Sequence, residues 1–203
     1  MRAMRRGVLG LGLASLLVSR AGAAPADLAF MVIRAGREVG THRVRFRDDA
    51  GLLRAMSEVR ITVRLAGFVV FRYAHDTEEA WRGNRLVALD SRLERNGQAS
   101  VSTARAEGER LRLRGSAGEA LLPAAAAPLT WWRAASLVPG VPLFDPREGL
   151  PVEPRLERRA EAGGQRVTLT GGEGAVILYD AAGTWVGFET TGEDGSRIIY
   201  RRA

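Results

Sequence analysis

Cysteine and lysine are absent from this chain of 203 residues, and histidine occurs only twice. Without cysteine the fold has no disulfide and no thiolate metal site, so it must be held by its core alone. Two histidines without a third ligand also make a poor zinc site. All 30 basic residues are arginine, a bias that we interpret as genomic composition and not as a signal for nucleic-acid binding.

The motifs of the common enzyme classes are missing as well. The chain has no Gly-x-Ser-x-Gly nucleophile elbow, no phosphate-binding loop and no dinucleotide fingerprint. We therefore predict neither a cofactor nor a metal, and we assign no catalytic residue.

Residues 1–23 have the organisation of a cleaved export signal. Arginines precede an apolar run at residues 7–18, and small residues before position 24 predict cleavage after Ala23. The run would reach about 18 Å as a helix, short of a hydrocarbon core of ~30 Å, so it predicts no membrane anchor. The Arg5-Arg6 pair and Arg20 favour twin-arginine export, with the general secretory route as the alternative. We expect a periplasmic or secreted protein.

The charge that remains after cleavage is modest. Loss of the leader takes away four arginines and no acid, so a net charge of +7 becomes +3. This value argues against a nucleic-acid partner. Residues 24–203 have the length of one domain with its own core, and no segment is predicted to cross a membrane. The oligomeric state is not predicted.

Two long strands joined at Ala66-Gly67 lie at the centre of the chain. In residues 55–65 apolar and polar side chains alternate, which places one face of a strand in a core, and residues 68–81 form a second strand. Turns such as Asn96-Gly97 are typical of hairpins. Further strands are expected at 28–34, 39–46, 85–95, 98–106, 110–116, 141–145, 152–159, 165–170, 175–179, 184–190 and 196–201.

So many short strands predict a mainly β protein. We expect a single antiparallel sheet of about ten to twelve strands, curled into a barrel or a half barrel because so long a sheet is unfavourable when open and flat. Residues 119–140, rich in alanine and proline, interrupt the pattern and predict a strap. Within it, Thr130 is expected to cap a short helix from Trp131 to Leu137.

Two histidines interrupt the inward faces of this sheet. Alternation puts His42 on the apolar face of residues 39–46 and His75 on the aromatic face of residues 68–81. If one strand separates them, the two side chains at matching height lie on the order of 10 Å apart, twice the strand spacing. That distance is too long for a shared metal ion.

Glu79 lies on the same face as His75 and four residues further along. The two are about 13 Å apart along a strand, so they cannot form a direct acid–base pair. A buried carboxylate needs a partner, and cross-strand groups such as Arg43 or Ser91 are candidates. We expect a buried polar network or a cavity lining more than direct catalysis.

A mixture of inward aromatic and polar side chains is typical of ligand pockets. Adjacent tryptophans at 131 and 132 cannot both face one core, so Trp131 is a candidate lid, and packing of both against the sheet is the alternative. The candidate ligand-binding residues are His42, Phe71, Tyr73, His75, Glu79, Trp81 and Trp131.

Several stretches resemble a family of exported bacterial proteins known only as a domain of unknown function. They are Gly40-Thr41-His42-Arg43, residues 67–75 (GFVVFRYAH), Glu79-Ala80-Trp81-Arg82-Gly83 with Leu86, and residues 179–200 from Tyr179-Asp180 through Asp194-Gly195-Ser196 to Tyr200. The resemblance covers nearly all of the mature chain and implies no activity. In architecture alone, the meander with an insert is also similar to the periplasmic lipoprotein-carrier half barrels, whose concave face holds acyl chains.

Three functions remain open. The first is a non-enzymatic binding or carrier module for a small apolar or amphipathic ligand, whose polar end His42, His75 and Glu79 would hold. The second is a hydrolase that uses His75 with Glu79. The third is a structural or envelope-assembly protein that contacts a partner through a sheet edge or Trp132.

Overall fold

The computed structural model describes residues 24–171, 174–192 and 194–203. The expected export signal, residues 1–23, lies outside the described residues. Most of the strands belong to one large sheet: β1 (Leu28–Arg34), β2 (Arg37–Asp49), β3 (Leu52–Leu65), β4 (Phe68–Arg82), β5 (Arg85–Arg95), β6 (Gln98–Glu107), β7 (Arg110–Gly115), β8 (Gly118–Pro123), β12 (Arg155–Glu161), β13 (Gly164–Thr170), β14 (Ala175–Asp180), β15 (Trp185–Thr191) and β16 (Arg197–Arg202). A small second sheet contains β9 (Ala127–Pro128), β10 (Leu143–Asp145) and β11 (Leu150–Val152).

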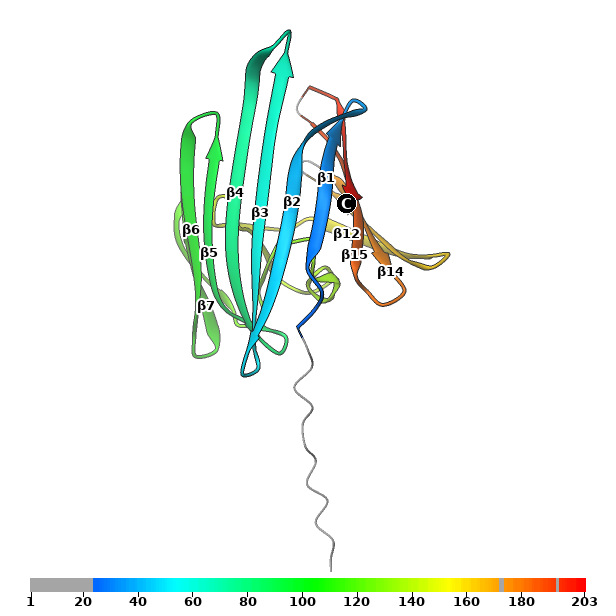
Figure 1. The fold of residues 1–203 in the computed structure, drawn as a ribbon. Helices are drawn as coiled ribbons and strands as arrows, with labels where there is room; N and C mark the ends of the chain where they lie inside the picture. The colour runs from blue at the N-terminus through cyan, green and yellow to red at the C-terminus, as the bar shows by residue number, and fades with distance from the viewer. Residues whose placement is uncertain (1–23, 172–173, 193) are drawn as a thin grey trace, which may run out of the picture.

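The large sheet is antiparallel and open. Its 13 strands follow the order β12-β13-β14-β15-β16-β1-β2-β3-β4-β5-β6-β7-β8, so β12 and β8 are edges and the first strand pairs with the last. Figure 1 shows the long strands β2 to β7 as one curved wall, with the C-terminal strands turned toward it. The prediction of a curled antiparallel sheet is confirmed as a half barrel, with slightly more strands than expected.

Glycine and strand irregularities produce the curl. A Cβ atom at Gly40 would lie 1.9 Å from the carbonyl oxygen of Arg60 on the next strand, so only glycine permits this close approach. The register also shifts between Val32 and Ile33, on the strand that pairs with β2 at this level. Bulges of this kind bend and twist a strand, which lets the sheet turn a corner.

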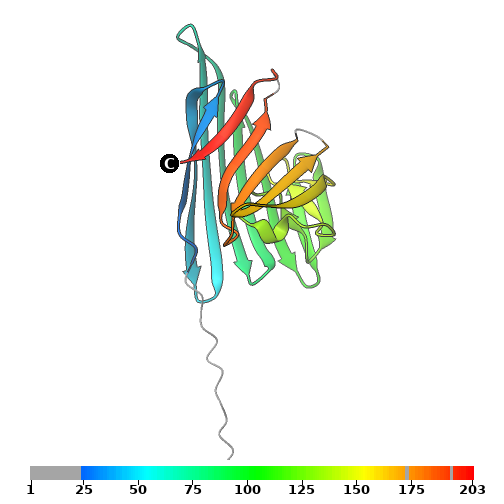
Figure 2. The same cartoon turned by 90° about the vertical axis from the view of Figure 1, so that its right-hand side faces the viewer.

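The strap expected at residues 119–140 begins later, because Gly118–Pro123 form the edge strand β8, and it is residues 124–152 that cross the concave side of the sheet. Figure 2 shows it, coloured green to yellow, between the two wings and away from the β3–β4 turn. Its attachment to β7 is close: the carbonyl of Glu148 accepts the Ser116 amide at 2.9 Å, and a Cβ at Gly115 would lie 2.0 Å from the same oxygen. The strap fills the core with Trp132, Leu137, Leu143 and Phe144, which are all buried.

The helix predicted from Trp131 to Leu137 is wrong. Only Ala134–Ser136 forms a short 3-10 turn, designated η1. The two tryptophans are held by contacts with distant strands: Trp131 stacks on Phe188 with ring centroids 4.9 Å apart, and Trp132 meets Trp81 at 6.2 Å. Most of the other predicted strands match the observed ones with bounds that differ by up to three residues. The larger differences are that Val141 precedes β10 and that the 152–159 segment is broken at Glu153 and Pro154.

Candidate functional site

A row of hydroxyl side chains crosses the concave face at mid-height. Ser57, Thr77, Ser91 and Ser102 stand on β3, β4, β5 and β6, and each is paired with the next in the register of the sheet. Thr77, Ser91 and Ser102 are buried, and Ser57 is half-buried. We name these four residues the hydroxyl row. It divides the concave face into a lower half, toward the β4–β5 turn, and an upper half, toward the β3–β4 turn.

The two histidines lie directly above the hydroxyl row and are held in the same way. His42 on β2 and His75 on β4 both stand opposite Val59 of β3, the strand between them. The two histidines therefore lie at the same height in the sheet. His42 Nε2 lies 2.6 Å from Ser57 Oγ, and His75 Nε2 lies 2.9 Å from Ser91 Oγ. Each imidazole is therefore hydrogen-bonded to the hydroxyl row on the next strand.

Burial favours the neutral form of both imidazoles. It lowers the pKa of His42 to about 3, and the charge of His75 adds to the effect. It also lowers the pKa of His75 to about 4, where Asp145 opposes the shift and Arg147 reinforces it. At neutral pH both rings are therefore uncharged hydrogen-bonding groups.

An ion pair on the strap reaches the same height as the hydroxyl row. Arg147 Nη2 donates to Asp145 Oδ2 at 2.8 Å, and Arg147 Nε is 3.0 and 3.1 Å from the two carboxylate oxygens. The adjacent backbone is fixed to β6, because Ser102 Oγ donates to the Pro146 carbonyl at 2.6 Å and Ser100 Oγ to the Arg147 carbonyl at 2.9 Å. The strap therefore places two opposite charges at one end of the row.

Aromatic side chains line the upper half. Phe71 and Tyr73 continue the inner face of β4 above His75, and successive ring centroids lie 6.4 and 6.1 Å apart. Tyr200, on β16, approaches the ring of His42 at 5.6 Å. Phe71, Tyr73 and His75 all keep part of their surface exposed. The upper half thus combines accessible aromatic surface with polar groups at its base.

The lower half is closed around Glu79. This carboxylate is fully buried and accepts two indole N–H bonds, from Trp81 at 2.8 Å and from Trp132 on the strap at 3.1 Å. The guanidinium carbon of Arg133 lies 4.3 Å from the centroid of the Trp81 ring, and Arg133 also donates to the Gly83 carbonyl at 2.9 Å. Glu79 is therefore the polar link that joins the strap to the sheet.

Burial raises the pKa of Glu79 to about 7, although the two indole bonds and the charge of Arg133 act in the opposite direction. A carboxyl group with this pKa exchanges a proton near neutral pH. It has no route to a ligand in the upper half, because its side chain is fully buried beneath Trp132.

The seven candidate residues thus fall into separate places. His42, Phe71, Tyr73 and His75 come together in the upper half and its base, whereas Glu79 and Trp81 lie in the closed lower half. Trp131 belongs to neither: it packs on Phe188, and its carbonyl accepts the hydroxyl of Tyr179 at 2.8 Å, so it is not a lid over the other aromatic residues.

Sequence reasoning missed most of the hydroxyl row and the strap ion pair. Ser57, Thr77 and Ser91 do share the inward parity of their strands, and that alternation was a usable signal. No pattern in the sequence indicates that Asp145 and Arg147 lie next to the hydroxyl row. Their position depends on where the strap crosses the sheet.

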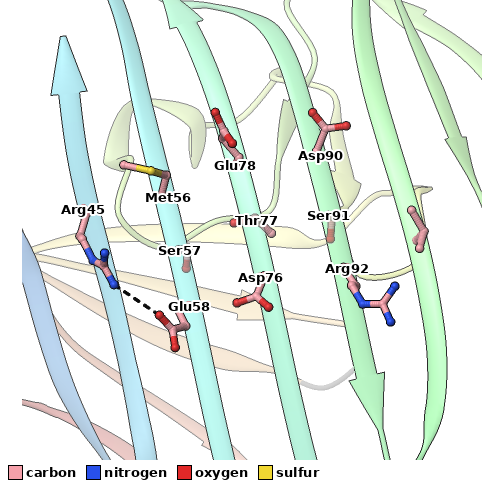
Figure 3. Close-up of a pocket in the computed structure, with 11 residues that line it drawn as sticks. Arg45, Met56, Ser57, Glu58, Asp76, Thr77, Glu78, Asp90, Ser91 and Arg92 are labelled. Atoms are coloured by element: carbon pink, nitrogen blue, oxygen red, sulfur yellow. Dashed lines mark ion pairs between the residues drawn. The ribbon is translucent and has the colours of Figure 1, made fainter.

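A hollow of about 500 Å³ lies on the outer face of the same strands, and Ser57, Thr77 and Ser91 of the hydroxyl row also border it. Figure 3 shows its charged side chains, which include Glu58, Asp76, Glu78 and Asp90, pointing away from the strap. Each of these four carboxylates has an arginine within 3.5 Å. The hollow is therefore an open surface whose carboxylates are neutralised by arginines, and none of the seven candidate ligand-binding residues lines it.

Within residues 24–171, 174–192 and 194–203, no group of three histidine, aspartate or glutamate side chains is arranged to hold a metal ion. None of the helical structure in that part of the chain has the length and apolarity needed to span a bilayer.

The comparison with protein families gives one match. A family model described as a domain of unknown function, DUF6134, matches residues 30–203. The chain belongs to this family. Membership confirms the resemblance to a family of unknown function, and the matched range contains every residue of the hydroxyl row and of the Glu79 link. No curated protein and no solved structure matches the chain.

Proposed function

We propose that this protein is a non-enzymatic binding or carrier module for a small amphipathic molecule, which lies on the upper half of the concave face. The observation that carries the proposal is the change along the inner face of β4. Trp81 and Glu79 are 1% and 0% exposed under the strap, whereas His75, Tyr73 and Phe71 on the same face remain partly exposed.

The chemistry of the upper half suits a ligand with one apolar and one polar end. Aromatic rings at Phe71 and Tyr73 would cover an apolar chain or ring, as in most small-molecule sites. At the base, His42 Nδ1 and Thr77 Oγ1 are buried without a hydrogen-bond partner among the described residues. Buried polar atoms are usually satisfied, so these two positions favour a polar group of a ligand or a water molecule there.

Laurate and lauryl alcohol are suitable probes, because they share an apolar chain and differ in the charge of the polar end. Isothermal titration should detect binding of at least one of them to the purified chain. The Phe71→Ala and Tyr73→Ala variants should each weaken binding by about tenfold, since each removes aromatic contact worth about 1.4 kcal/mol. Val101→Ser, on the outer face, is the matched control and should bind as the unchanged protein does.

Native mass spectrometry and lipid extraction of the freshly purified protein complete the test. A bound amphipathic molecule is expected. If no molecule is extracted and neither probe binds, or if Val101→Ser weakens binding as much as Phe71→Ala, the proposal is wrong.

The hydrolase alternative gains less support. It requires His75 to act with Glu79, but the two oxygens of Glu79 accept bonds from Trp81 and Trp132, and its side chain is fully buried. The hydroxyl beside His75 belongs to Ser91, which is 4% exposed and lies in the middle of β5. A serine nucleophile must meet its substrate, and this position gives little access.

A further inference from the structure

The β3–β4 hairpin extends beyond both of its neighbours. Pairing of β2 with β3 ends at Gly40 and Ile61, and pairing of β4 with β5 ends at Tyr73 and Arg95. Beyond these levels, residues 62–71 form a two-stranded ribbon that has no third strand among the described residues. Figure 1 shows this ribbon as the tallest part of the molecule. A two-stranded ribbon by itself is only marginally stable in water.

The end of this ribbon, residues 63–71, carries several exposed apolar side chains. Leu65 and Phe68 are paired in register and are 69% and 77% exposed, and Val70 is 53% exposed. On the inner face, Val63 and Phe71 are paired in register. Exposed apolar side chains that gather in one place mark an interaction site, whereas scattered ones do not. We name residues 63–71 the hairpin tip.

Positive charge accompanies this apolar surface. Residues 61–74 contain Arg64 and Arg72 and no acidic residue. Asp76, the first acid further along β4, is ion-paired to Arg60 at 2.7 Å. Glu94 lies opposite Ala74 on β5, and Glu38 on β2 is paired with Ile33 of β1. The tip is therefore cationic, and its counter-charges lie behind it.

We propose that the hairpin tip docks the protein on the surface of a lipid bilayer that contains anionic lipid. Leu65 and Phe68 enter the boundary between head groups and acyl chains, and Arg64 and Arg72 contact the lipid phosphates. Apolar anchors combined with basic residues are the usual elements of such interfacial binding. The anchors Leu65 and Phe68 lie beyond Phe71, the outermost residue of the proposed ligand site, and the docking does not depend on the ligand proposed there.

The spacing of the tip agrees with this docking. Arg64 directly precedes Leu65, and Arg72 follows Val70 by two residues, so the charges lie within about 7 Å of the apolar side chains at ~3.3 Å per residue. A head-group layer is about 5–8 Å thick on each side of the hydrocarbon core.

Vesicle sedimentation of the chain from Ala24 onward tests the proposal. This chain contains all of the described strands and omits the apolar run at residues 7–18, which would bind lipid by itself. The protein should sediment with vesicles of phosphatidylcholine and phosphatidylglycerol, and about tenfold less tightly with phosphatidylcholine alone. The L65S/F68S variant should bind at least about tenfold more weakly, and R64Q/R72Q should lose the preference for anionic vesicles.

The matched control is V101S/L121S, which changes two other exposed apolar residues that are 55% and 46% exposed. It should bind as the unchanged protein does. Equal binding by the control and L65S/F68S, or no binding of the unchanged protein to anionic vesicles, would overturn the proposal. Self-association that disappears in L65S/F68S, without vesicle binding, would overturn it too and would assign the tip to a second copy of the chain. Unchanged circular dichroism and melting verify that each variant is folded.

Discussion

The two halves of the concave face differ although one strand supplies both. Along β4, alternate residues from Phe71 to Trp81 point inward, and by parity alone they belong to one surface. The lower half is closed, with Glu79 bonded between two indoles, and the upper half keeps its aromatic rings partly exposed. The difference comes from the strap, which covers only one of them. Strand alternation therefore sets the direction of a side chain, and a distant segment sets its burial.

The largest expected effect tests this contrast directly. Trp81→Ala should lower the free energy of unfolding by about 3–5 kcal/mol, because it opens a cavity in the lower half and removes a donor from Glu79. Phe71→Ala, on the same face of the same strand, should cost less than about 1 kcal/mol because its ring is already partly exposed. Urea denaturation measures both. Equal losses would mean that the two halves are packed alike.

The second prediction concerns the link between the strap and the sheet. Glu79→Gln keeps the shape of the side chain but turns one acceptor into a donor, which then faces an indole N–H. We expect a loss of about 1–3 kcal/mol, because a buried donor is left without an acceptor. Trp132→Phe removes the strap's N–H alone and is the matched variant. If both variants are as stable as the unchanged protein, the indole bonds do not hold the strap.

The third prediction uses the opposite pKa shifts of the two regions. The histidines at the base of the upper half have folded pKa values of about 3 and 4, so only the unfolded state gains their protons as pH falls below 6.5. Glu79, with a folded pKa of about 7, acts in the opposite direction, because the folded state holds a proton that the unfolded state releases above pH 4.5. Two imidazoles outweigh one carboxyl.

Stability should therefore fall by about 1–2 kcal/mol between pH 6.5 and pH 5. Removal of the opposing carboxyl in Glu79→Gln should roughly double this dependence, and His42→Gln should nearly abolish it. Denaturant titrations at several pH values provide the measurement. A stability that rises on acidification in this range would contradict the assignment of neutral, buried imidazoles.

The smallest expected effect has the opposite sign. Thr77→Val replaces a buried hydroxyl that has no partner among the described residues with a methyl group of similar size. The variant should be as stable as the unchanged protein or more stable by up to about 1 kcal/mol. A clear loss of stability would show that the hydroxyl is satisfied in solution, by water or by a ligand at the base of the upper half.

Alternation in the sequence was sufficient to predict the sheet and the direction of its side chains. It placed His42, His75 and Glu79 on inward faces, and all three are directed there, because a strand has a strict period of two. The number of strands also predicted that the sheet curls. The sequence did not indicate that Gly40 is the residue that permits the corner.

The parts that could not be predicted depend on contacts between distant segments. Trp132 donates a hydrogen bond to Glu79 although 53 residues separate them, and the sequence around neither residue predicts this contact. The helix predicted for residues 131–137 failed for the same reason, since tertiary contacts of the two tryptophans override local propensity. The division into a closed and a partly exposed half likewise required the path of the strap.

The pairing of β1 with β16 has a kinetic consequence. The sheet consists of two meanders of neighbouring hairpins, β1 to β8 and β12 to β16, and each of these two wings can form through local contacts. The seam that joins the wings is the pairing of β1 with β16, in which Val32 lies opposite Tyr200 across almost the whole described chain. Closing so long a loop costs conformational entropy before the contacts between the two strands form, and this cost slows folding. Assembly of the two wings should therefore precede the seam, and the seam should limit the rate at which the native protein forms.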